Sequence, residues 1–496
     1  MTGKKRTGRK ILLAVAVTLG VSGCSLAPSF LRPDVPLEET WIGTALEAQQ
    51  EAGSHAVRDL GWRDYFRDPQ LQQFIALALE NNHDLKTAAL NAELARAQYR
   101  ITRSDRLPAV DGRATATRTR TAEDLSYYGT ASTDNAFTVG LDITSYELDF
   151  FSRVKNASDA KLNAYLGTLE ARDAAQLSII SAVSKAYYEM RIAHKLMVLA
   201  EDVSKTREDA WKLTKLQVDA GTASETTLQG MRSAIELARA DYQAQKRASI
   251  QARNTLSTLI GQPVTRLTLE KALSLMDQFP EQPLVAGLPS EVLLARPDIR
   301  EAEYALKAAN ANIGAARAAC FPSISLVGSV GYASTDLDNL FDSDNGTWTF
   351  GPRLNLPIFN YGKLRANVEV MTVSEKIAVE SYGKAIQNAF ADIDNALAGR
   401  ETLEKQVKAT IRSDEAVARR LYLVDMQMRE GIVDGLTLLD AERESFNSRQ
   451  NVLRTGQMIL NNNVDLYVAL GGGLKEFTTQ TQPAVQAEKP MKKPVL

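Results

Sequence analysis

Apolar and polar residues alternate in four short segments of the chain. From Phe137 to Thr144 the alternation is strict, and the segments at 323–332 and 347–356 also place apolar residues on one face and polar residues on the other. The segment at 111–117 keeps the polar face but is weaker on the apolar one. Half-buried strands of water-soluble sheets and lipid-facing strands of membrane barrels both show this period of two. We predict strands at about 108–121, 135–149, 322–334 and 346–359.

A spacing close to 3.5 residues follows the second predicted strand. No Pro occurs from Ser152 to Val218. Eleven positions spaced three or four residues apart from Leu162 to Met197 form the expected helix-packing seam, and eight of them are apolar. This spacing is typical of coiled-coil packing, and at about 1.5 Å per residue such a helix spans on the order of 100 Å. His194 falls on the seam, so we interpret it as a packed residue rather than a metal ligand. The predicted long helices are 152–218 and 363–430, with shorter partners at 224–260 and 435–470. Two further half-length helices are expected at 69–106 and 290–319.

These elements occur twice in the same order. Asp84 and Asp298 are separated by 214 residues, and the step from the turn glycine Gly221 to the turn glycine Gly431 is 210 residues. An internal repeat of this length predicts a fold built from two similar halves. The predicted organisation is a signal peptide at 1–23, an N-terminal segment at 24–68, a first repeat at 69–262, a connector at 263–289, a second repeat at 290–473 and a flexible tail at 474–496.

The N-terminus has the pattern of an export signal. Five basic residues within the first ten precede an apolar run from Ile11 to Leu19, which is too short to span a bilayer. The sequence that follows, Val21-Ser22-Gly23-Cys24, resembles a bacterial lipoprotein signal, which makes Cys24 the expected acylated N-terminus. An ordinary signal peptide with an incidental cysteine is the alternative. By the same resemblance, Ser25 after the cysteine favours the outer membrane over the inner one.

Composition and charge argue against several kinds of function. The net charge of −2 moves to about −7 once the five basic residues of the signal are removed, and no basic patch is interleaved with aromatic residues, so nucleic acid is not an expected partner. The histidines His55, His83 and His194 lack metal-ligand spacing. Cys320, the only cysteine besides Cys24, is expected to be a small apolar filler. We predict neither an enzyme nor a metal site, and no cofactor beyond the covalent lipid on Cys24.

No run of 18 apolar residues follows the signal, so we expect any membrane crossing to be made by the predicted strands. Four strands alone would leave two edges unpaired in lipid, where each lost backbone hydrogen bond costs several kcal/mol. The chain is therefore expected to share a barrel with copies of itself. Two copies would give eight strands, whose side chains nearly fill the interior, and three copies would give twelve strands and room for a pore.

Eight segments carry a resemblance to a known family. They are Asp68-Pro69-Gln70-Leu71, Glu147-Leu148-Asp149-Phe150-Phe151, Ala295-Arg296-Pro297-Asp298-Ile299, Ile313-Gly314-Ala315-Ala316-Arg317-Ala318-Ala319, Phe321-Pro322-Ser323-Ile324-Ser325, Leu354-Asn355-Leu356-Pro357-Ile358-Phe359, Leu436-Thr437-Leu438-Leu439-Asp440-Ala441 and Leu470-Gly471-Gly472-Gly473. Nearly everything from Cys24 to Gly473 resembles the TolC-type outer-membrane efflux channels, most closely their OprM-like, NodT-type lipoprotein branch. The resemblance implies a mainly α fold with a membrane β-barrel part, in which a homotrimer forms a 12-stranded barrel and a periplasmic barrel of 12 helices.

The resemblance also implies a gate just after the second turn glycine, Gly431. By motif, Leu436 and Asp440 match the constriction of OprM-type channels, and at i and i+4 they share one helical face. A trimer would then hold a ring of leucines, which can close a pore by dewetting, next to a ring of carboxylates, which concentrates cations. The equivalent positions of the first repeat, Thr226 and Gly230, carry neither feature. The alternative is that Asp440 is a solvated acid near a helix N-terminus, where a negative charge is favourable.

Two positions depart from the family pattern around this gate. Thr437 stands where TolC itself has a second acid, so the sequence predicts a single acidic ring. Met428 stands where the family often has a tyrosine. The residues that latch the closed state are therefore not carried over from the family.

The turns that join the long helices are expected to dock a periplasmic adaptor, as the resemblance implies. The expected docking residues are Gly221, Thr222, Ala223, Ser224, Gly431, Ile432 and Val433. A simpler reading is that the two glycines cap helices in the left-handed conformation. Both readings are compatible, because a capped turn makes an exposed tip.

By resemblance, the chain is the outer-membrane exit duct of a tripartite multidrug efflux system. It would be a passive, gated homotrimer, lipid-anchored in the outer membrane, extending into the periplasm and coupled to an adaptor and an inner-membrane resistance–nodulation–division transporter. A duct for metal-ion efflux or protein secretion is one alternative, and a non-conducting coiled-coil trimer is another.

Overall fold

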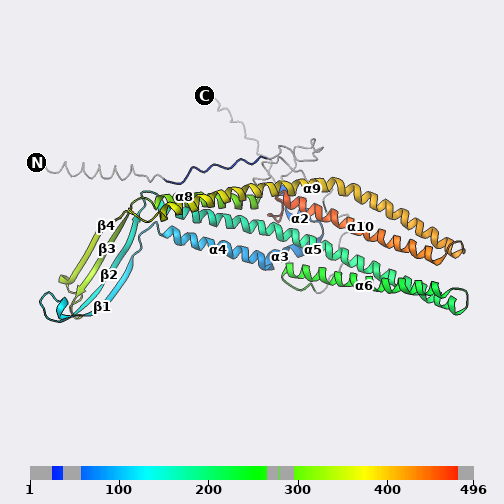
Figure 1. The fold of residues 1–496 in the computed structure, drawn as a ribbon, viewed down its shortest axis with the longest axis horizontal. Helices are drawn as coiled ribbons and strands as arrows, with labels where there is room; N and C mark the ends of the chain where they lie inside the picture. Colours follow the sequence, from blue (N-terminus) through cyan, green and yellow to red (C-terminus); the bar gives the residue numbers. More distant parts are fainter. Residues whose placement is uncertain (1–24, 37–56, 265–278, 280–294, 479–496) are drawn as a thin grey trace, which may run out of the picture. The chain divides into compact units, whose positions relative to one another are not determined.

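The computed structural model describes residues 25–36, 57–264, 279 and 295–478 (Figure 1). The elements of the first repeat are α3 (Pro69–Asn81), α4 (His83–Ser104), β1 (Asp111–Thr121), β2 (Ser132–Leu148), α5 (Arg153–Asp219) and α6 (Glu225–Ile260). Those of the second are α8 (Pro297–Ala318), β3 (Ser323–Ser334), β4 (Gly346–Asn355), α9 (Lys363–Arg429) and α10 (Gly435–Ala469). The chain is mainly helical, with one small antiparallel sheet, and is internally repeated, so the predicted fold class is confirmed.

The remaining elements are short. They are η1 (Val57–Asp59), α2 (Trp62–Tyr65), η2 (Glu123–Leu125) and η4 (Ser343–Asn345). The signal peptide, Cys24, nearly all of the connector at 263–289 and the tail from residue 479 lie outside the described residues. No helix in the described part of the chain is long and apolar enough to cross a membrane.

The chain divides into two compact units. The first contains residues 1–35, 90–170 and 300–385, and the second contains residues 36–89, 171–299 and 386–496. The long helices α5 and α9, 67 residues each, contribute residues to both. The first unit holds the sheet, and the second holds the two turns between long helices.

The sheet of the first unit is antiparallel, with strand order β1-β2-β3-β4 (Figure 1). Its register runs without interruption along β1, where Ala114 lies opposite Val139, and along β4, where Gly346 lies opposite Tyr332. The edge strands β1 and β4 have no second partner strand among the described residues. β4 ends at Asn355, short of the expected end at residue 359, and Pro357, which has no N–H to donate to a ladder, follows two residues later.

One face of the sheet is apolar. It carries the even-numbered residues of β1, β3 and β4 and the odd-numbered residues of β2 from Phe137 to Ile143, and we call it the apolar face. In one row across it, Leu141, Val330 and Trp348 are 53%, 60% and 76% exposed in the single chain. Exposure of large apolar side chains along a whole face indicates that something apolar covers it.

The opposite face of the sheet is polar. Thr115 and Thr138 are hydrogen-bonded across β1 and β2, and Arg113 forms an ion pair of 3.0 Å with Asp142. A β-bulge in β2 follows Ile143, so the apolar face continues at Tyr146 and Leu148. The alternation seen in the sequence therefore corresponds to two chemically distinct faces.

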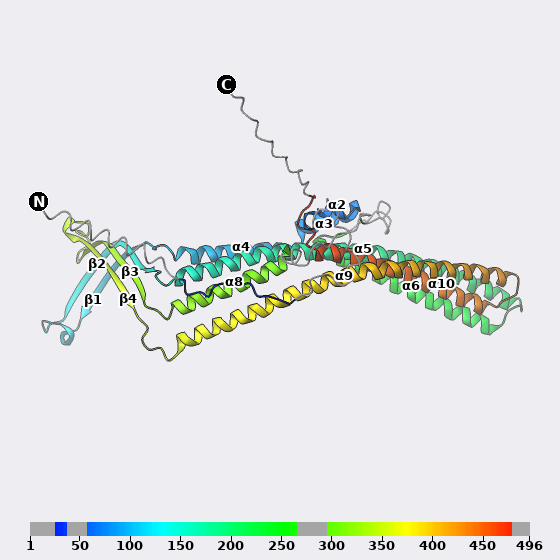
Figure 2. The same ribbon diagram turned by 90° about the horizontal axis from the view of Figure 1, so that it is seen from above.

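Four helical segments of the first unit lie next to one another in the order α4, α5, α8, α9 (Figure 2). The outer two leave apolar side chains exposed at helical spacing. These are Leu90, Leu94 and Ile101 on α4, and Val370, Val373 and Ile377 on α9. The edge helices thus resemble the edge strands in having an uncovered side.

A strap of residues 25–35 lies along α8 in the same unit. Ser25 donates a hydrogen bond of 3.0 Å to Asn156, and Arg317 near the end of α8 donates to the carbonyl of Leu26. Arg32 binds Glu303 through both carboxylate oxygens, at 2.9 and 3.0 Å. The strap therefore runs antiparallel to α8, and its first residue lies near the end of α8 that leads into the sheet.

Aromatic rings fill the core of the second unit. Tyr65 stacks on Tyr467 with ring centroids 4.1 Å apart, and Phe66 meets the same ring edge-on. Next to them Asp68, fully buried, caps α3 through the N–H of Gln70 and forms an ion pair of 3.2 Å with the buried Arg191. A paired, hydrogen-bonded carboxylate tolerates burial, because each charge replaces the water that the other has lost.

The helix expected from residue 69 to about 106 is interrupted. Asn82 ends α3, and its side-chain oxygen accepts hydrogen bonds from the N–H groups of Asp84 and Leu85, which caps α4. Its amide nitrogen donates to the carbonyl of Leu259 near the end of α6. Asn82 therefore joins three helix ends.

Residues 475–478, expected to begin the flexible tail, are bonded to the chain. The N–H groups of Trp62 and Arg63 donate to the carbonyls of Lys475 and Glu476, at 3.0 and 3.1 Å. Arg63 also forms an ion pair with Glu476. This pairing anchors the residues after α10 beside α2.

Candidate functional site

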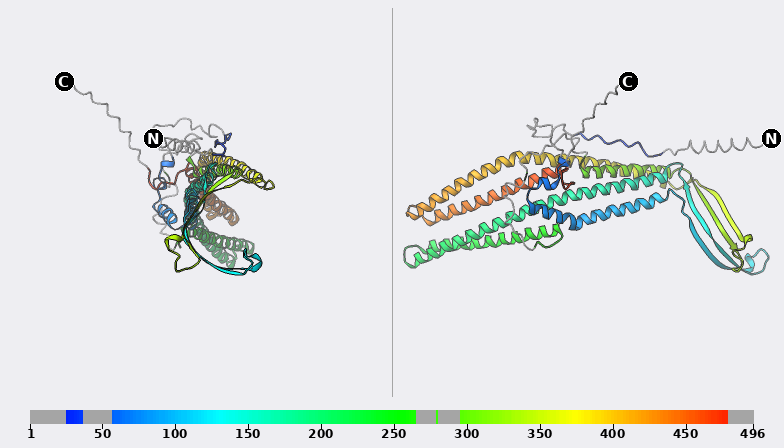
Figure 3. Two further views of the ribbon diagram at one scale, coloured as in Figure 1. Left: turned by 90° about the vertical axis from the view of Figure 1, so that its left-hand side faces the viewer. Right: turned by 180° about the vertical axis from the view of Figure 1, so that it is seen from behind.

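The two helical hairpins of the second unit, α5–α6 and α9–α10, end in turns with the same backbone (Figure 3). In the first turn the N–H of Gly221 donates to the carbonyl of Val218, and that of Thr222 donates to Gln217. Both bonds recur in the second turn, where Gly431 donates to Met428 and Ile432 donates to Gln427. This is the Schellman arrangement, and both glycines have φ above +70°.

A short polar side chain begins the next helix after each turn. The Ser224 hydroxyl accepts from the N–H of Thr227, 3.1 Å away, and the Asp434 carboxylate accepts from the N–H of Thr437, 2.9 Å away. The Thr437 hydroxyl also donates to Asp434, and these two bonds lower the pKa of that carboxyl. Thr437 stands where TolC itself has an acid, and here it donates hydrogen bonds to the capping residue Asp434.

The tips present small and apolar groups to solvent. Gly221, Thr222 and Ser224 are exposed in the first turn, and Ala223 is partly buried. In the second, Gly431 is exposed, Val433 is partly buried, and Ile432 is 71% exposed. An isoleucine held outward by a hydrogen-bonded turn is a candidate contact for another protein.

Leu436 and Asp440 both lie exposed on the same side of α10, one turn apart. Leu436 lies over Gly230 of α6, so the two hairpins meet at this level. Ala441, the next residue after Asp440, is buried. The pair predicted as a gate is therefore on a free surface of the single chain.

Two arginines, which the sequence analysis missed, bind Asp440. Arg443 lies one turn further along α10, with its guanidinium 2.5 Å from Oδ1, and Arg420 on α9 lies 3.8 Å from Oδ2. Arg420 also forms an ion pair with Glu444. The spacing of Arg443 was visible in the sequence, whereas the proximity of Arg420 depends on how α9 packs against α10. The charge of Asp440 is consequently shared within a four-residue network.

A second carboxyl, Glu442, lies nearby and faces inward. Burial raises its pKa, Arg207 of α5 opposes that effect, and Asp425 of α9 adds to it. Arg207 itself donates to the carbonyl of Ala234 on α6, 3.2 Å away. Charged groups thus lie between the two hairpins just behind the predicted gate.

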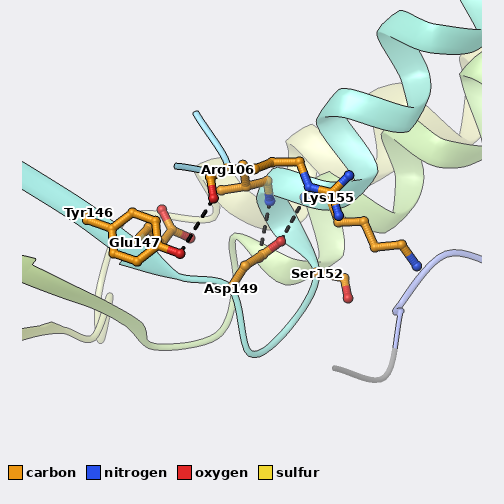
Figure 4. A pocket seen from close by; sticks show the side chains of 7 residues that line it. Arg106, Tyr146, Glu147, Asp149, Ser152 and Lys155 are labelled. Atoms are coloured by element: carbon orange, nitrogen blue, oxygen red, sulfur yellow. Dashed lines mark hydrogen bonds between the residues drawn. The ribbon is translucent and has the colours of Figure 1, made fainter. Parts of the chain in front are cut away.

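A cavity of about 380 Å³ lies in the first unit where β2 leads into α5 (Figure 4). Asp149 caps α5 there, accepting from the N–H groups of Val154 and Lys155 at 3.1 and 2.7 Å. The Tyr146 hydroxyl points to the carbonyl of Arg106, 3.5 Å away. These polar groups serve the strand-to-helix turn, which gives the motif at 147–151 a structural role.

Cys320 does not fill the core, contrary to expectation. It is exposed, because it lies in the turn after α8 while the neighbouring Phe321 stacks on Phe151 with centroids 4.7 Å apart. Among the described residues no group of three or more His, Cys, Asp or Glu side chains could hold a metal ion.

Comparisons with known proteins by family, by sequence and by structure all give the same result. The family described as outer membrane efflux protein matches residues 74–262 and 288–472, one block in each repeat. The probable efflux pump outer membrane protein TtgC of Pseudomonas putida is 40% identical over 483 residues, which covers 97% of this chain and 99% of that protein. The cation efflux system protein CusC of Escherichia coli is 37% identical, covering 94% and 99%.

Solved structures agree with the sequence comparisons. The MtrE outer membrane channel of Neisseria gonorrhoeae, in its open state, superposes with a TM-score of 0.82 at 42% identity, covering 92% of this chain and all of that one. The CmeC outer membrane channel of Campylobacter jejuni gives a TM-score of 0.83 at 26% identity, covering 91% and 96%.

Proposed function

Because the chain belongs to the outer membrane efflux protein family and is an outer-membrane component of an efflux system, we propose that three copies of it form one gated exit duct. The observation that carries the proposal is a four-stranded sheet with an exposed apolar face and two free edges. In lipid, free edges lose backbone hydrogen bonds at several kcal/mol each. Pairing β1 of one copy with β4 of the next removes both edges. Three copies give twelve strands, the number that the family resemblance implies, which is wide enough for a pore.

The helical part of the first unit supports the same assembly. The exposed stripes on α4 and α9 lie on the outer two of four adjacent helices, as β1 and β4 lie at the two edges of the sheet. Packing α4 of one copy on α9 of the next would cover both stripes. Strand pairing (β1 with β4) and helix packing (α4 with α9) would then join the same two neighbouring copies.

Passive conduction through this duct is controlled, in our proposal, at Leu436 and Asp440. Three exposed leucines at one level can exclude water from a narrow pore, and three carboxylates one turn away favour cations. Arg420 and Arg443 bind the same carboxylates and reduce that preference. The gate is therefore a ring of partly neutralised acids beside a hydrophobic ring.

The tips are proposed to dock a periplasmic adaptor, which couples the duct to an inner-membrane resistance–nodulation–division transporter. The supporting observation is the pair of rigid turns, whose bonds hold Thr222 and Ile432 at equivalent positions. A trimer would present both kinds of turn to the adaptor.

The lipid anchor is proposed at Cys24. That residue lies outside the described part of the chain, but Ser25 after it is bonded to Asn156, near the start of α5. The strap therefore ends where the helices of the first unit lead into the sheet. A diacylated or triacylated Cys24 would lie beside the inner leaflet of the outer membrane and anchor the chain stably.

The exported compounds are proposed to be organic drugs or solvents. Relatives at 39–40% identity are named for antibiotic, toluene and solvent efflux, whereas CusC is named for cation efflux. Metal-ion efflux and protein secretion are the alternative cargoes, and a non-conducting coiled-coil trimer is the alternative assembly.

Single-channel recording from the purified mature protein in planar bilayers tests the proposal. The expected result is a small, cation-selective conductance that is closed most of the time, from a species that cross-links as a trimer. Cysteines introduced one at a time along β1 should cross-link with a cysteine on β4 of a neighbouring copy at the positions where the two edges pair, since a disulfide requires Cα atoms about 4.4–6.8 Å apart. A monomer that carries no current in either low or high salt would overturn the duct.

A further inference from the structure

Two arginines lie on the apolar face of the sheet, at its loop end. β1 is regular throughout its length, so Arg118 and Arg120 share a face with Ala114 and Ala116. Both side chains are exposed. Basic side chains on a face that is otherwise apolar require an explanation.

The strand register fixes their level on that face. Ala116 lies opposite Phe137, the last apolar pair, whereas Arg118 lies opposite Asn135 and Arg120 opposite Thr133. At about 3.3 Å per residue, the arginines lie roughly 7 and 13 Å beyond the last apolar row. The apolar band thus ends where the arginines begin, at the end of the sheet away from the helices of the first unit (Figure 1).

Neither arginine forms an ion pair with another described residue. Arg113, on the same strand but on the polar face, pairs with Asp142 at 3.0 Å. The nearby Asp134 lies opposite Thr119 and accepts a hydrogen bond from Ser132. Arg118 and Arg120 are therefore free to bind an anion from outside the chain.

Aromatic side chains surround this end of the sheet. Tyr127 and Tyr128 in the β1–β2 loop are 95% and 86% exposed and touch edge to face. On the apolar face, Tyr332 meets Phe341 of the β3–β4 loop, with centroids 5.7 Å apart. Exposed Tyr and Trp residues are typical of the level at which lipid headgroups lie.

We infer that Arg118 and Arg120 bind the phosphate groups of a phosphorylated glycolipid of the outer leaflet, of the lipid A type. This rests on the proposed function, because it requires the sheet to lie in an outer membrane with its loops outside. A guanidinium binds phosphate through two parallel hydrogen bonds, and two guanidiniums two residues apart can reach two phosphates of one headgroup. The acyl chains of the same lipid would cover Phe137 and Val139 on the apolar face.

Native mass spectrometry of the purified trimer with added lipid A tests this inference. The double variant Arg118→Gln/Arg120→Gln should bind bisphosphorylated lipid A on the order of ten-fold more weakly than the unmodified protein. Arg113→Gln, on the polar face of the same strand, is the matched control and should bind normally. Dephosphorylated lipid A should bind the unmodified protein as weakly as lipid A binds the double variant.

Three results would overturn the inference. They are equal binding of lipid A by the double variant and the unmodified protein, equal binding of the two lipids by the unmodified protein, and displacement of lipid A by millimolar inorganic phosphate. The comparison of the two lipids uses only the unmodified protein, so it tests the inference even if the double variant does not assemble. Trimer formation and conductance of the unmodified protein are measured alongside, so that failure of the duct is distinguished from failure of the lipid site.

Discussion

Arg420 on α9 lies between two carboxylates of α10: its guanidinium is 3.8 Å from Asp440 and forms a second ion pair with Glu444. It joins the two helices of the hairpin at the level of the proposed gate. Exposed pairs of this kind contribute little to stability, so we expect the arginine to matter mainly for the charge at the proposed gate.

Charge changes at this level should shift ion selectivity in opposite directions. Asp440→Asn removes three carboxylates from the proposed trimer and should weaken cation selectivity, whereas Arg420→Gln should strengthen it. The reversal potential under a salt gradient measures both. Glu236→Gln, an exposed carboxyl on α6 paired with Arg239, is the control and should leave the potential unchanged. An unchanged potential in Asp440→Asn would remove that residue from the constriction.

Leu436→Ser should keep the duct open longer. A ring of hydroxyl groups holds water where a ring of leucines excludes it, so the open probability in planar bilayers should rise severalfold. Leu237→Ser on α6, a similarly exposed leucine, should have no such effect. If both variants stay closed to the same extent as the unmodified protein, closure depends on another residue.

Acid should loosen the second tip turn before the first. The folded-state pKa of Asp434 is lowered by the bonds from Thr437, so its contribution is complete above the unfolded value of about 3.9 and is lost as the pH falls through the lower folded value. Ser224 caps the first turn without titrating. Hydrogen exchange at residues 435–438 and 225–228, corrected for intrinsic rates, compares the two turns. Asp434→Asn keeps a capping side chain and should abolish the difference in pH dependence.

Breaking the buried ion pair of the second unit should destabilise it strongly. Asp68→Ala leaves Arg191 charged and buried, at a cost of about 3–5 kcal/mol, and should lower the thermal midpoint. Arg63→Gln breaks a more exposed pair with Glu476 and should cost less than about 1 kcal/mol. Equal effects of the two variants would mean that Asp68 contributes no more than a surface charge.

A side chain at residue 314 should dislodge the strap from α8. A Cβ on Gly314 would lie 2.7 Å from that of Ala27 and 2.5 Å from the amide nitrogen of Asn156. Gly314→Val should therefore speed hydrogen exchange throughout the strap, residues 25–35. Gly383→Ala on α9, where a Cβ meets nothing within 4 Å, should leave the strap protected. Undisturbed exchange in the valine variant would show that the strap is held by its other contacts alone.

Much of the fold could be predicted because its periodicities are long and uninterrupted. The alternation from Phe137 to Thr144 lies in one strand, and the 3.5-residue spacing after Ser152 lies in one helix of 67 residues. The internal repeat strengthened these predictions, because each element found in one repeat predicted an equivalent element in the other. The helix break at Asn82 was missed because an asparagine in a helical pattern shows its capping role only when its partners, such as Leu259, are known.

The candidate site was less accessible to prediction. Leu436 and Asp440 were identified through family resemblance, and their role is still a prediction. Arg420 was missed because it lies 20 residues from Asp440 in the chain and meets it only through packing of α9 on α10. The exposure of Cys320 was also missed, since composition does not show which way a turn directs a side chain.

The two tip turns have one backbone and two sets of side chains. Selection on a duplicated turn can preserve its backbone shape in both copies, because that shape depends on the glycine and on the backbone hydrogen bonds around it. The side chains are then free to diverge. Gly230 and Thr226 in one copy, against Asp440 and Leu436 in the other, record such a divergence. Because the hairpin is repeated, the residues of the proposed gate, Leu436 and Asp440, can change in one copy while the equivalent residues of the other copy stay as they are.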